Sequence, residues 1–486
     1  MKYLTLDVGT TCCKTQLFDE TGEILFYRTK ECPLKKQDGQ TYVDIDGIAS
    51  SVKDLIRDAA DAFPFDSIAV SSFGEAFVTL DKDDNIVTYP MLYTDPRGKE
   101  EAEFLGRTIT PERLFRTTGT TPNPMYSVSK LLYIKNHAPE RFRKIDKCLL
   151  ICDYIGYLLT GKRVIDYSLA ARTGVFDIRK KAFASDILEE LGISPELFSV
   201  PEKTGSIVGK VLPGVAEELH LTRACLLVLG SHDQVCATIG TGVIDSGASA
   251  DGMGTVECMT AVFDEPPGGI EFGNMGYCVV PFLGHYCTYM FNYTSNVIVN
   301  WFRNGILHGY SGGNDNQFAY LESGNGPTDV LVLPYFAGCA TPYQDTDAKG
   351  AILNLTKETT DTDIYRAILE STAYEMRLNA EVAKEYGIDI CETVATGGGA
   401  NSGLWLQIKA DIQHIPVRTL RSSEGGLCGC AMLSAVALGS CGTLADARDV
   451  FVRYKDTFVP GTQYKATYEK KYGKYKNLYQ TVKEFF

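Results

Sequence analysis

The segment Asp-Val-Gly-Thr-Thr at residues 7–11 has residue types suited to holding an anion. Its small side chains leave backbone amides and hydroxyls open to a phosphate group, and Asp7 can hold Mg²⁺ through water. Lys14 supplies a positive charge three residues further on. A plain hairpin turn is the commoner explanation of such a string when it stands alone. The segment therefore predicts a phosphate loop only in combination with other features.

A second glycine-rich segment, Thr-Gly-Gly-Gly-Ala-Asn-Ser, occupies residues 396–402. It follows an apolar run at 390–395 and precedes a helical pattern at 404–412, which predicts a strand, a glycine turn and a helix. Glycines let a ligand lie against backbone, and a helix N-terminus favours negative charge. A tight turn without a ligand is an equal alternative. The GxxxxGKS string is absent, so a Walker-type nucleotide site is disfavoured.

Asp233 stands in Ser-His-Asp-Gln, between an apolar strand at 224–230 and a helical stretch at 235–239. Open α/β sheets bind ligands at such strand ends, although a helix-capping aspartate is a common alternative. His232 fits a structural role better than a catalytic one. A carboxylate with a pKa of about 3.9 lies about 12 units, or about 16 kcal/mol, below an alcohol. Asp233 could thus orient a hydroxyl and accept its proton late.

The elements that position these residues recur along the chain. The apolar run at 1–7 and the alternating pattern at 13–18 predict a β-hairpin around the first glycine loop. Gly254-Thr255, Cys258 and Phe263-Asp264-Glu265 repeat Gly9-Thr10, Cys13 and Phe18-Asp19-Glu20 at one constant offset near half the chain length. This repetition predicts a duplicated fold and a second phosphate hairpin.

Both halves combine strands with helical patterns, at 44–63 in the first half and 361–386 in the second. The pattern predicts two α/β lobes, residues 1–245 and 246–486, that form a cleft between them. The tail at 467–486 predicts an amphipathic helix with a packing role. A chain of 486 residues is too long for one hydrophobic core.

Composition narrows the class of protein. With 44% hydrophobic and 22% charged residues, the chain is typical of soluble globular proteins. Its net charge of -14 disfavours general binding of nucleic acid or anionic membranes. The start lacks a secretory or transit pattern, and the 15 cysteines are scattered through apolar stretches, which favours a cytoplasmic location with reduced cysteines. Cysteine and histidine spacing does not favour structural zinc.

Together these segments resemble the FGGY carbohydrate kinases, a branch of the actin and Hsp70-like ATPase fold that includes xylulose, glycerol and gluconate kinases. The likeness runs over nearly the whole chain, and its order and spacing are most similar to the xylulose kinases. The best local matches are DVGTT at 7–11, MYSVSKLLYIKNHAPERF at 125–142, DYIGYLLTGKRVIDYSLAARTGVFD at 153–177, GSHDQ at 230–234 and GGGANSGLWLQIKADI at 397–412.

The resemblance implies an α/β fold of two actin-like (ribonuclease H-like) lobes, with sugar and base in the first, ATP in the second and catalysis in the cleft. It implies that Asp233 is the base and that Asp7 and Asp233 hold Mg²⁺ through water. It also implies two binding sets. The substrate set is Glu75, Ala76, Asp95, Asp233 and Gln234, and the ATP set is Thr10, Thr11, Lys14, Gly254, Thr255, Gly398, Gly399, Asn401 and Ser402.

Several positions depart from the family pattern. Glu75, in Phe-Gly-Glu-Ala, stands where xylulose kinases have the His of Gln-Met-His-Gly and glycerol kinases the Glu of Gln-Arg-Glu-Thr. Asp95 and Arg97 resemble the family Asp-x-Arg, with a surface ion pair as the alternative. Tyr133 replaces the usual Trp of KLxW, and residues 338–342 replace Gly-Glu-Arg-Thr-Pro. These departures leave the phosphate apparatus intact and the sugar open.

The resulting hypothesis is an ATP-dependent kinase for a small sugar, such as the ketopentose xylulose, without nucleic-acid or membrane partners. Glycerol, erythritol or a sugar acid are alternative substrates. A non-catalytic nucleotide-binding regulator of the same fold is the alternative from another class. A homodimer is expected only at the level of the family.

Overall fold

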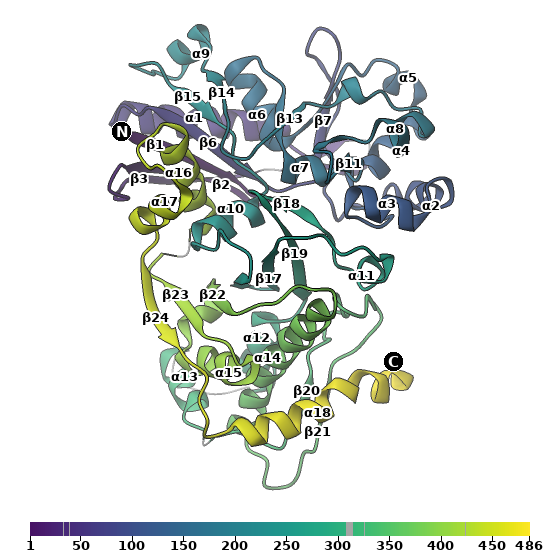
Figure 1. Ribbon diagram of the computed structural model, residues 1–486, viewed down its shortest axis with the longest axis vertical. Coiled ribbons are helices and arrows are strands. Elements are labelled where there is room, and N and C mark those ends of the chain that lie inside the picture. Colours follow the sequence, from purple (N-terminus) through teal and green to yellow (C-terminus); the bar gives the residue numbers. More distant parts are fainter. Residues whose placement is uncertain (33, 38, 308–313, 325, 423) are drawn as a thin grey trace.

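The computed structural model describes residues 1–486 except 33, 38, 308–313, 325 and 423. Two large mixed sheets, each covered by helices, form two parts of the molecule (Figure 1). The first sheet comes from the N-terminal half and the second from the C-terminal half. This α/β architecture in two halves is the one predicted from the sequence.

The first sheet has six strands in the order β14-β15-β6-β1-β2-β3. Its centre is the predicted hairpin, in which β1 pairs antiparallel with β2, while β6 and β15 run parallel to β1. The strand bounds are β1 Lys2–Val8, β2 Cys12–Asp19, β3 Ile24–Glu31, β6 Ser67–Ser72, β14 Ile207–Lys210 and β15 Leu226–Val228. All six β6 side chains are buried, as expected of a central strand covered on both faces.

The second sheet, of seven strands, repeats this plan in the order β18-β19-β17-β16-β22-β23-β24. Here β16 pairs antiparallel with β17 and parallel with β22, so β19-β17-β16-β22-β23 matches β3-β2-β1-β6-β15 in order and direction. The bounds are β16 Ala248–Met253, β17 Glu257–Phe263, β18 Val280–Phe282, β19 His285–Asn292, β22 Glu392–Thr396, β23 Val417–Leu420 and β24 Tyr454–Phe458. The duplication predicted from the sequence repeat is present in the topology.

The three helices predicted at 44–63, 361–386 and the tail form as α1 (Ile45–Ala62), α14 (Asp361–Glu385) and α18 (Lys465–Val482). Local sequence explains where they begin. Asp44 accepts a hydrogen bond from the Gly47 amide, and Thr360 forms a capping box with Asp363. The structure also contains the helices α2 (Lys99–Thr108), α4 (Ser127–His137), α6 (Ile151–Thr160), α7 (Tyr167–Ala171), α12 (Asn296–Trp301) and α15 (Gly403–Gln413).

Helices α10 (Asp233–Gly240) and α16 (Gly425–Ala437) follow the matching strands β15 and β23 and pack against each other. Their backbones touch, because a Cβ atom on Gly240 would lie 1.9 Å from the Gly425 carbonyl oxygen. Although α16 belongs to the C-terminal half, it lies beside β1 and β6 of the first sheet (Figure 1). The division of the chain into 1–245 and 246–486 stays a prediction.

Among the described residues, no helix combines the length and the apolar character that a bilayer span requires.

Candidate active site

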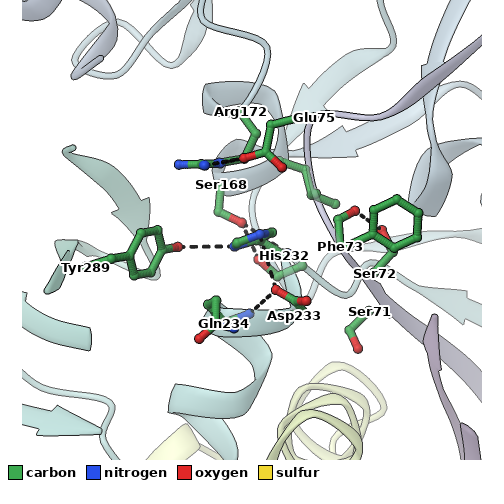
Figure 2. Close-up of polar contacts among 12 residues, drawn as sticks. Ser71, Ser72, Phe73, Glu75, Ser168, Arg172, His232, Asp233, Gln234 and Tyr289 are labelled. Carbon is green, nitrogen blue, oxygen red and sulfur yellow. Dashed lines mark hydrogen bonds and ion pairs between the residues drawn. The ribbon is translucent and has the colours of Figure 1, made fainter. Parts of the chain in front are cut away.

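Asp233 is the first residue of α10, at the carboxyl end of the central part of the first sheet. Its Oδ1 accepts a hydrogen bond from the Gln234 amide at 2.6 Å and lies 3.2 Å from Nε2 of His232 (Figure 2). The Asp233 side chain keeps 32% of its surface exposed. It can therefore reach a ligand while its position is held by its neighbours.

Burial and neighbouring charged groups change the pKa of Asp233. Burial among protein atoms raises the pKa of Asp233 to about 8, and the negative charge of Asp7 adds to the increase. The charge of Glu75 also raises this pKa. The hydrogen bond from the Gln234 amide and the charge of Arg172 lower it. Asp233 is thus a much stronger base than a carboxylate in water, whose pKa is about 3.9.

Asp7 lies near the end of β1, on the side of the predicted phosphate hairpin. Its Oδ1 accepts a hydrogen bond of 2.5 Å from the Ser71 hydroxyl. Burial raises the pKa of Asp7, which Ser71 and Lys14 partly offset. Gly426, in the first turn of α16, adjoins this carboxylate, since a Cβ atom there would lie 3.6 Å from it. Matching helices therefore reach the site from both halves, α10 with Asp233 and α16 beside Asp7.

Lys14 is placed near Asp7 but is already paired with a carboxylate. Its Nζ lies 2.9 Å from Oε2 of Glu424, the residue that precedes α16. A phosphate group would have to share or displace this partner. Lys14 as an ATP contact stays a prediction.

Glu75 and Arg172 form a buried ion pair on the other side of Asp233 (Figure 2). Nε of Arg172 donates a hydrogen bond to Oε1 of Glu75 at 2.6 Å, and Nη2 contacts the same oxygen. The Glu75 and Arg172 side chains are only 4% and 6% exposed. Glu75 also has a φ of 62°, in the left-handed region that costs a non-glycine residue energy. Such strain at a buried charged residue favours a functional explanation.

Protein groups from both halves surround the Arg172 guanidinium. It lies over the rings of Tyr126, at 5.2 Å, and Tyr289, at 5.8 Å, and Nη1 donates to Sγ of Cys278 at 3.6 Å. The Tyr289 hydroxyl is 3.2 Å from Nδ1 of His232, and burial keeps the pKa of that histidine far below its usual value. His232 is therefore neutral and contacts both Asp233 and the second sheet. Its structural role stays a prediction.

The buried side chain of Asp166 connects the segments that carry Arg172 and Asp233. Oδ2 of Asp166 accepts hydrogen bonds from the hydroxyls of Ser168, Ser231 and Thr204 at 2.7 to 2.9 Å. Ser168 lies on α7, the helix that ends directly before Arg172, and Ser231 directly precedes His232. Asp166 thus ties the helix that presents Arg172 to the loop that presents Asp233.

The remaining predicted substrate residues differ in their surroundings. Ala76 is fully buried, and its amide donates to the Gly74 carbonyl at 2.7 Å. Asp95 accepts two hydrogen bonds from the Arg97 side chain, at 2.9 and 2.6 Å, and their side chains are 14% and 12% exposed. The ion pair is therefore partly buried, and the substrate role of Asp95 stays a prediction. Within the described residues, no hydrogen bond joins Asp95 to Glu75, Arg172 or Asp233. Tyr93, two residues before Asp95, is close enough to Glu75 and Asp233 to be affected by their charges. Burial raises the pKa of Tyr93, and these two charges raise it further.

The predicted phosphate residues occupy two hairpin turns. Thr10 and Thr11 lie between β1 and β2, and Gly254 and Thr255 lie between β16 and β17. Thr11 and Thr255 are exposed and open to a ligand. The second turn is braced by Asn296 of α12, whose Nδ2 donates to the carbonyls of Met253 and Gly254 at 2.9 Å each.

The glycine turn lies directly against the second hairpin. A Cβ atom on Gly397 would be 2.8 Å from the Met253 carbonyl oxygen, and one on Gly399 would be 2.9 Å from the Met253 Cβ. Gly398 and Asn401 are exposed, and Gly399 is buried. The Ser402 hydroxyl caps α15 by accepting a hydrogen bond from the Trp405 amide, and it donates one to Glu322 at 2.6 Å. It therefore already has two hydrogen-bond partners within the protein. Gly254, Thr255 and the glycine turn thus form one continuous surface.

Sequence reasoning missed Arg172, Tyr289, Cys278, Asn296 and Tyr93. Arg172 alone left a signal, as an arginine directly after the small apolar stretch 169–171 within a motif already noted. A charged side chain next to a buried segment usually needs a buried partner.

Comparison with known proteins gives matches along the chain. The models of the FGGY family of carbohydrate kinases match the chain, the N-terminal domain at residues 2–240 and the C-terminal domain at 283–438. The xylulose kinase of Bacillus subtilis is 27% identical over 503 residues, covering 100% of this chain and 98% of its own. Two structures from Lactobacillus acidophilus superpose with a TM-score of 0.90 and cover 99% of this chain and 98% of theirs: a gluconate kinase, 25% identical, and a ligand-bound xylulose kinase, 24% identical.

Proposed function

The chain belongs to the FGGY family of carbohydrate kinases, and from that membership we propose that it transfers the γ-phosphoryl group of ATP to a hydroxyl of a small neutral sugar, a ketopentose such as xylulose. The observation that carries the proposal is the position of Asp233, between Asp7 on the phosphate side and the Glu75–Arg172 pair. A base, a phosphate hairpin and the polar groups of the proposed sugar site then meet at one residue.

Asp233 is the base in this proposal. With a pKa of about 8 it lies about 8 units, or about 10 kcal/mol, below an alcohol. The gap is smaller than for an ordinary aspartate but still too large for proton removal before the reaction begins. Asp233 therefore orients the hydroxyl and takes its proton as the bond to phosphorus forms.

Asp7 and Asp233 fit a magnesium ion. Both are carboxylates, Asp7 is among the groups that raise the pKa of Asp233, and Mg²⁺ in phosphate sites is usually held by one or two carboxylates with water and phosphate oxygens. When bound, Mg²⁺ would neutralise charge on the phosphate oxygens. Thr10, Thr11, Gly254 and Thr255 then meet the phosphates, and Gly398, Gly399, Asn401 and Ser402 lie near the adenosine.

The charge of the sugar pocket favours a neutral substrate over a sugar acid. Glu75 and Asp233 both present carboxylates, and Arg172 is already engaged by Glu75, Cys278 and two aromatic rings. The carboxylate of an aldonic acid would meet the negative charge of Glu75, would meet that of Asp233 as well once Asp233 loses its proton, and would find no free cation at Arg172. Neutral hydroxyls, in contrast, can donate hydrogen bonds to these carboxylates.

An ADP-release assay with pentuloses, hexuloses, polyols and aldonic acids tests the proposal. We expect the highest kcat/KM with a ketopentose and little turnover of aldonic acids. Preference for an aldonic acid would contradict the neutral-substrate assignment. ATP binding without any sugar-stimulated ADP release would instead support the non-catalytic regulator.

Glu75→Gln should change the order of substrates before it changes the affinity for ATP. The variant keeps the shape of the side chain but removes a negative charge from the sugar pocket, so kcat/KM for the ketopentose should fall about tenfold or more. Turnover of aldonic acids should rise relative to it, while KM for ATP stays unchanged. Glu101→Gln on α2 is the matched control, since Glu101 is equally buried but bonds to Asn136 on α4. An unaltered order of substrates would remove Glu75 from the sugar site.

The pH profile should report the raised pKa of Asp233. The base must be unprotonated to accept a proton, so kcat/KM for the sugar should increase with pH to a plateau. Burial and the charges of Asp7 and Glu75 raise the pKa of Asp233 to about 8, and bound Mg²⁺ would lower it, so the midpoint should lie below 8 but above that of an ordinary carboxylate. Because the charge of Glu75 helps to raise this pKa, the midpoint of Glu75→Gln should move to lower pH. Initial rates between about pH 5 and 9.5 at saturating Mg-ATP measure both. A profile that falls with pH across this range would contradict Asp233 as the base.

A further inference from the structure

A cluster of three buried charges lies at the base of the second phosphate hairpin. Nζ of Lys409 on α15 is 2.7 Å from Oδ2 of Asp251 on β16 and also contacts Oε1 of Glu257, the first residue of β17. All three side chains have no exposed surface. Lys409 therefore joins both strands of the hairpin to the helix that follows the glycine turn.

The two carboxylates lie on the same face of the hairpin. Met253 pairs with Glu257 across the strands, and Asp251 is two residues before Met253, so Asp251 and Glu257 are diagonal neighbours. Like charges so placed repel each other. Among the described residues, Lys409 alone forms ion pairs with them, and Asp251 Oδ1 and Glu257 Oε2 lack hydrogen-bond partners.

Stability alone does not explain such a cluster. Burial acts against the charge of Lys409, and Asp251 and Glu257 raise its pKa in compensation. Buried ion pairs are often no more stabilising than well-packed apolar side chains of the same volume, but they do define one arrangement of the elements they join. Here the joined elements carry Gly254 and Thr255 on one side and the glycine turn on the other.

We propose that Lys409 is a positioning residue for the nucleotide, which fixes the hairpin of Gly254 and Thr255 to α15 through Asp251 and Glu257. In this way it sets the spacing between the phosphate turn and the turn near the adenosine. The inference rests on the proposed function for its assignment of these turns to ATP.

Lys409→Met should weaken nucleotide binding selectively. Without the ammonium group the two buried carboxylates lose the partner that joins them to α15, and Glu257, whose pKa burial already raises to about 7, takes up a proton. The hairpin is then no longer fixed to α15, and the triphosphate loses its alignment. We expect the Kd and KM for ATP to rise about tenfold or more, because small displacements of binding groups have effects of this size. KM for the sugar should remain within about twofold, since Glu75, Arg172 and Asp233 all come from the first half of the chain.

Lys471→Met is the matched control. Lys471 on α18 is also buried and paired with a buried glutamate, Glu370 of α14, but it contacts neither hairpin nor glycine turn through any described hydrogen bond. Both variants lose a buried cation and should lose thermal stability. Only Lys409→Met should lose affinity for ATP. An equal ATP affinity in the two variants would overturn the proposal.

Equilibrium binding of ATP without sugar keeps this test separate from the proposed function. If the wild-type protein binds ATP but phosphorylates no sugar, the function fails while the comparison of Kd values still decides the role of Lys409. If Lys409→Met does not fold, Lys409→Arg takes its place. Its larger planar group keeps the charge but alters the spacing, so ATP binding should weaken by about threefold or more, and an unchanged Kd would overturn the proposal.

Discussion

Asp233→Asn should lower kcat by about 10²- to 10⁴-fold, the range typical for loss of a general base. The amide has nearly the same shape as the carboxylate but cannot accept the proton of the sugar hydroxyl. ATP should still bind, because the candidate residues for its phosphates and adenosine lie on other elements. The measurements are kcat from ADP release and Kd for ATP by calorimetry.

The control for this variant is another buried aspartate of the first half. Burial also raises the pKa of Asp153 to about 8, but its carboxylate accepts a hydrogen bond from Ser199 and not from a group at the active site. Asp153→Asn should leave turnover per folded molecule unchanged. Undiminished turnover of Asp233→Asn, or an equal loss in both variants, would reject Asp233 as the base.

Features that depend on local pattern could be predicted from the sequence. The hairpin around Thr10, the repeat at Gly254 and the strand, turn and helix around residues 396–402 each arise from residues within one short segment. Strand alternation, glycine position and helix periodicity record such structure directly. The strand end before Asp233 could be predicted from local pattern in the same way.

Features that depend on contacts between distant segments could not be predicted. Glu75 and Arg172 are 97 positions apart, and Lys14 and Glu424 are 410 positions apart. Each partner alone looks like an ordinary charged residue, and only the folded chain makes the pair. The same holds for α16, which follows a strand of the second sheet but packs on the first.

The cluster around Arg172 shows how such a distant contact adds to the chemistry of the site. Glu75 could be singled out from its place in a motif, but its environment depends on α7, on Tyr126 and on Tyr289 from the other half of the chain. These contacts fix the direction of the carboxylate and bring its charge to bear on Asp233. The proposed sugar site and the proposed base are therefore electrostatically coupled.

Arg172→Met should have the largest effect on stability. It leaves the Glu75 carboxylate buried without its cation, a change that costs about 3–5 kcal/mol in buried pairs. Since Arg172 also lowers the pKa of Asp233, its loss should raise that pKa further and move the rise of kcat/KM to higher pH. Thermal denaturation and the pH profile measure the two effects.

The double variant Arg172→Met/Glu75→Gln separates stability from function. Neutralising both partners removes the unpaired charge, so much of the lost stability should return, as a double-mutant cycle would detect. Activity toward the ketopentose should stay low, because the oriented carboxylate of Glu75 is still missing. If the double variant were as active as the wild type, the pair would serve only folding, and the coupling between sugar pocket and base would not exist. If Arg172→Met alone were as stable as the wild type, the buried ion pair itself would be in error.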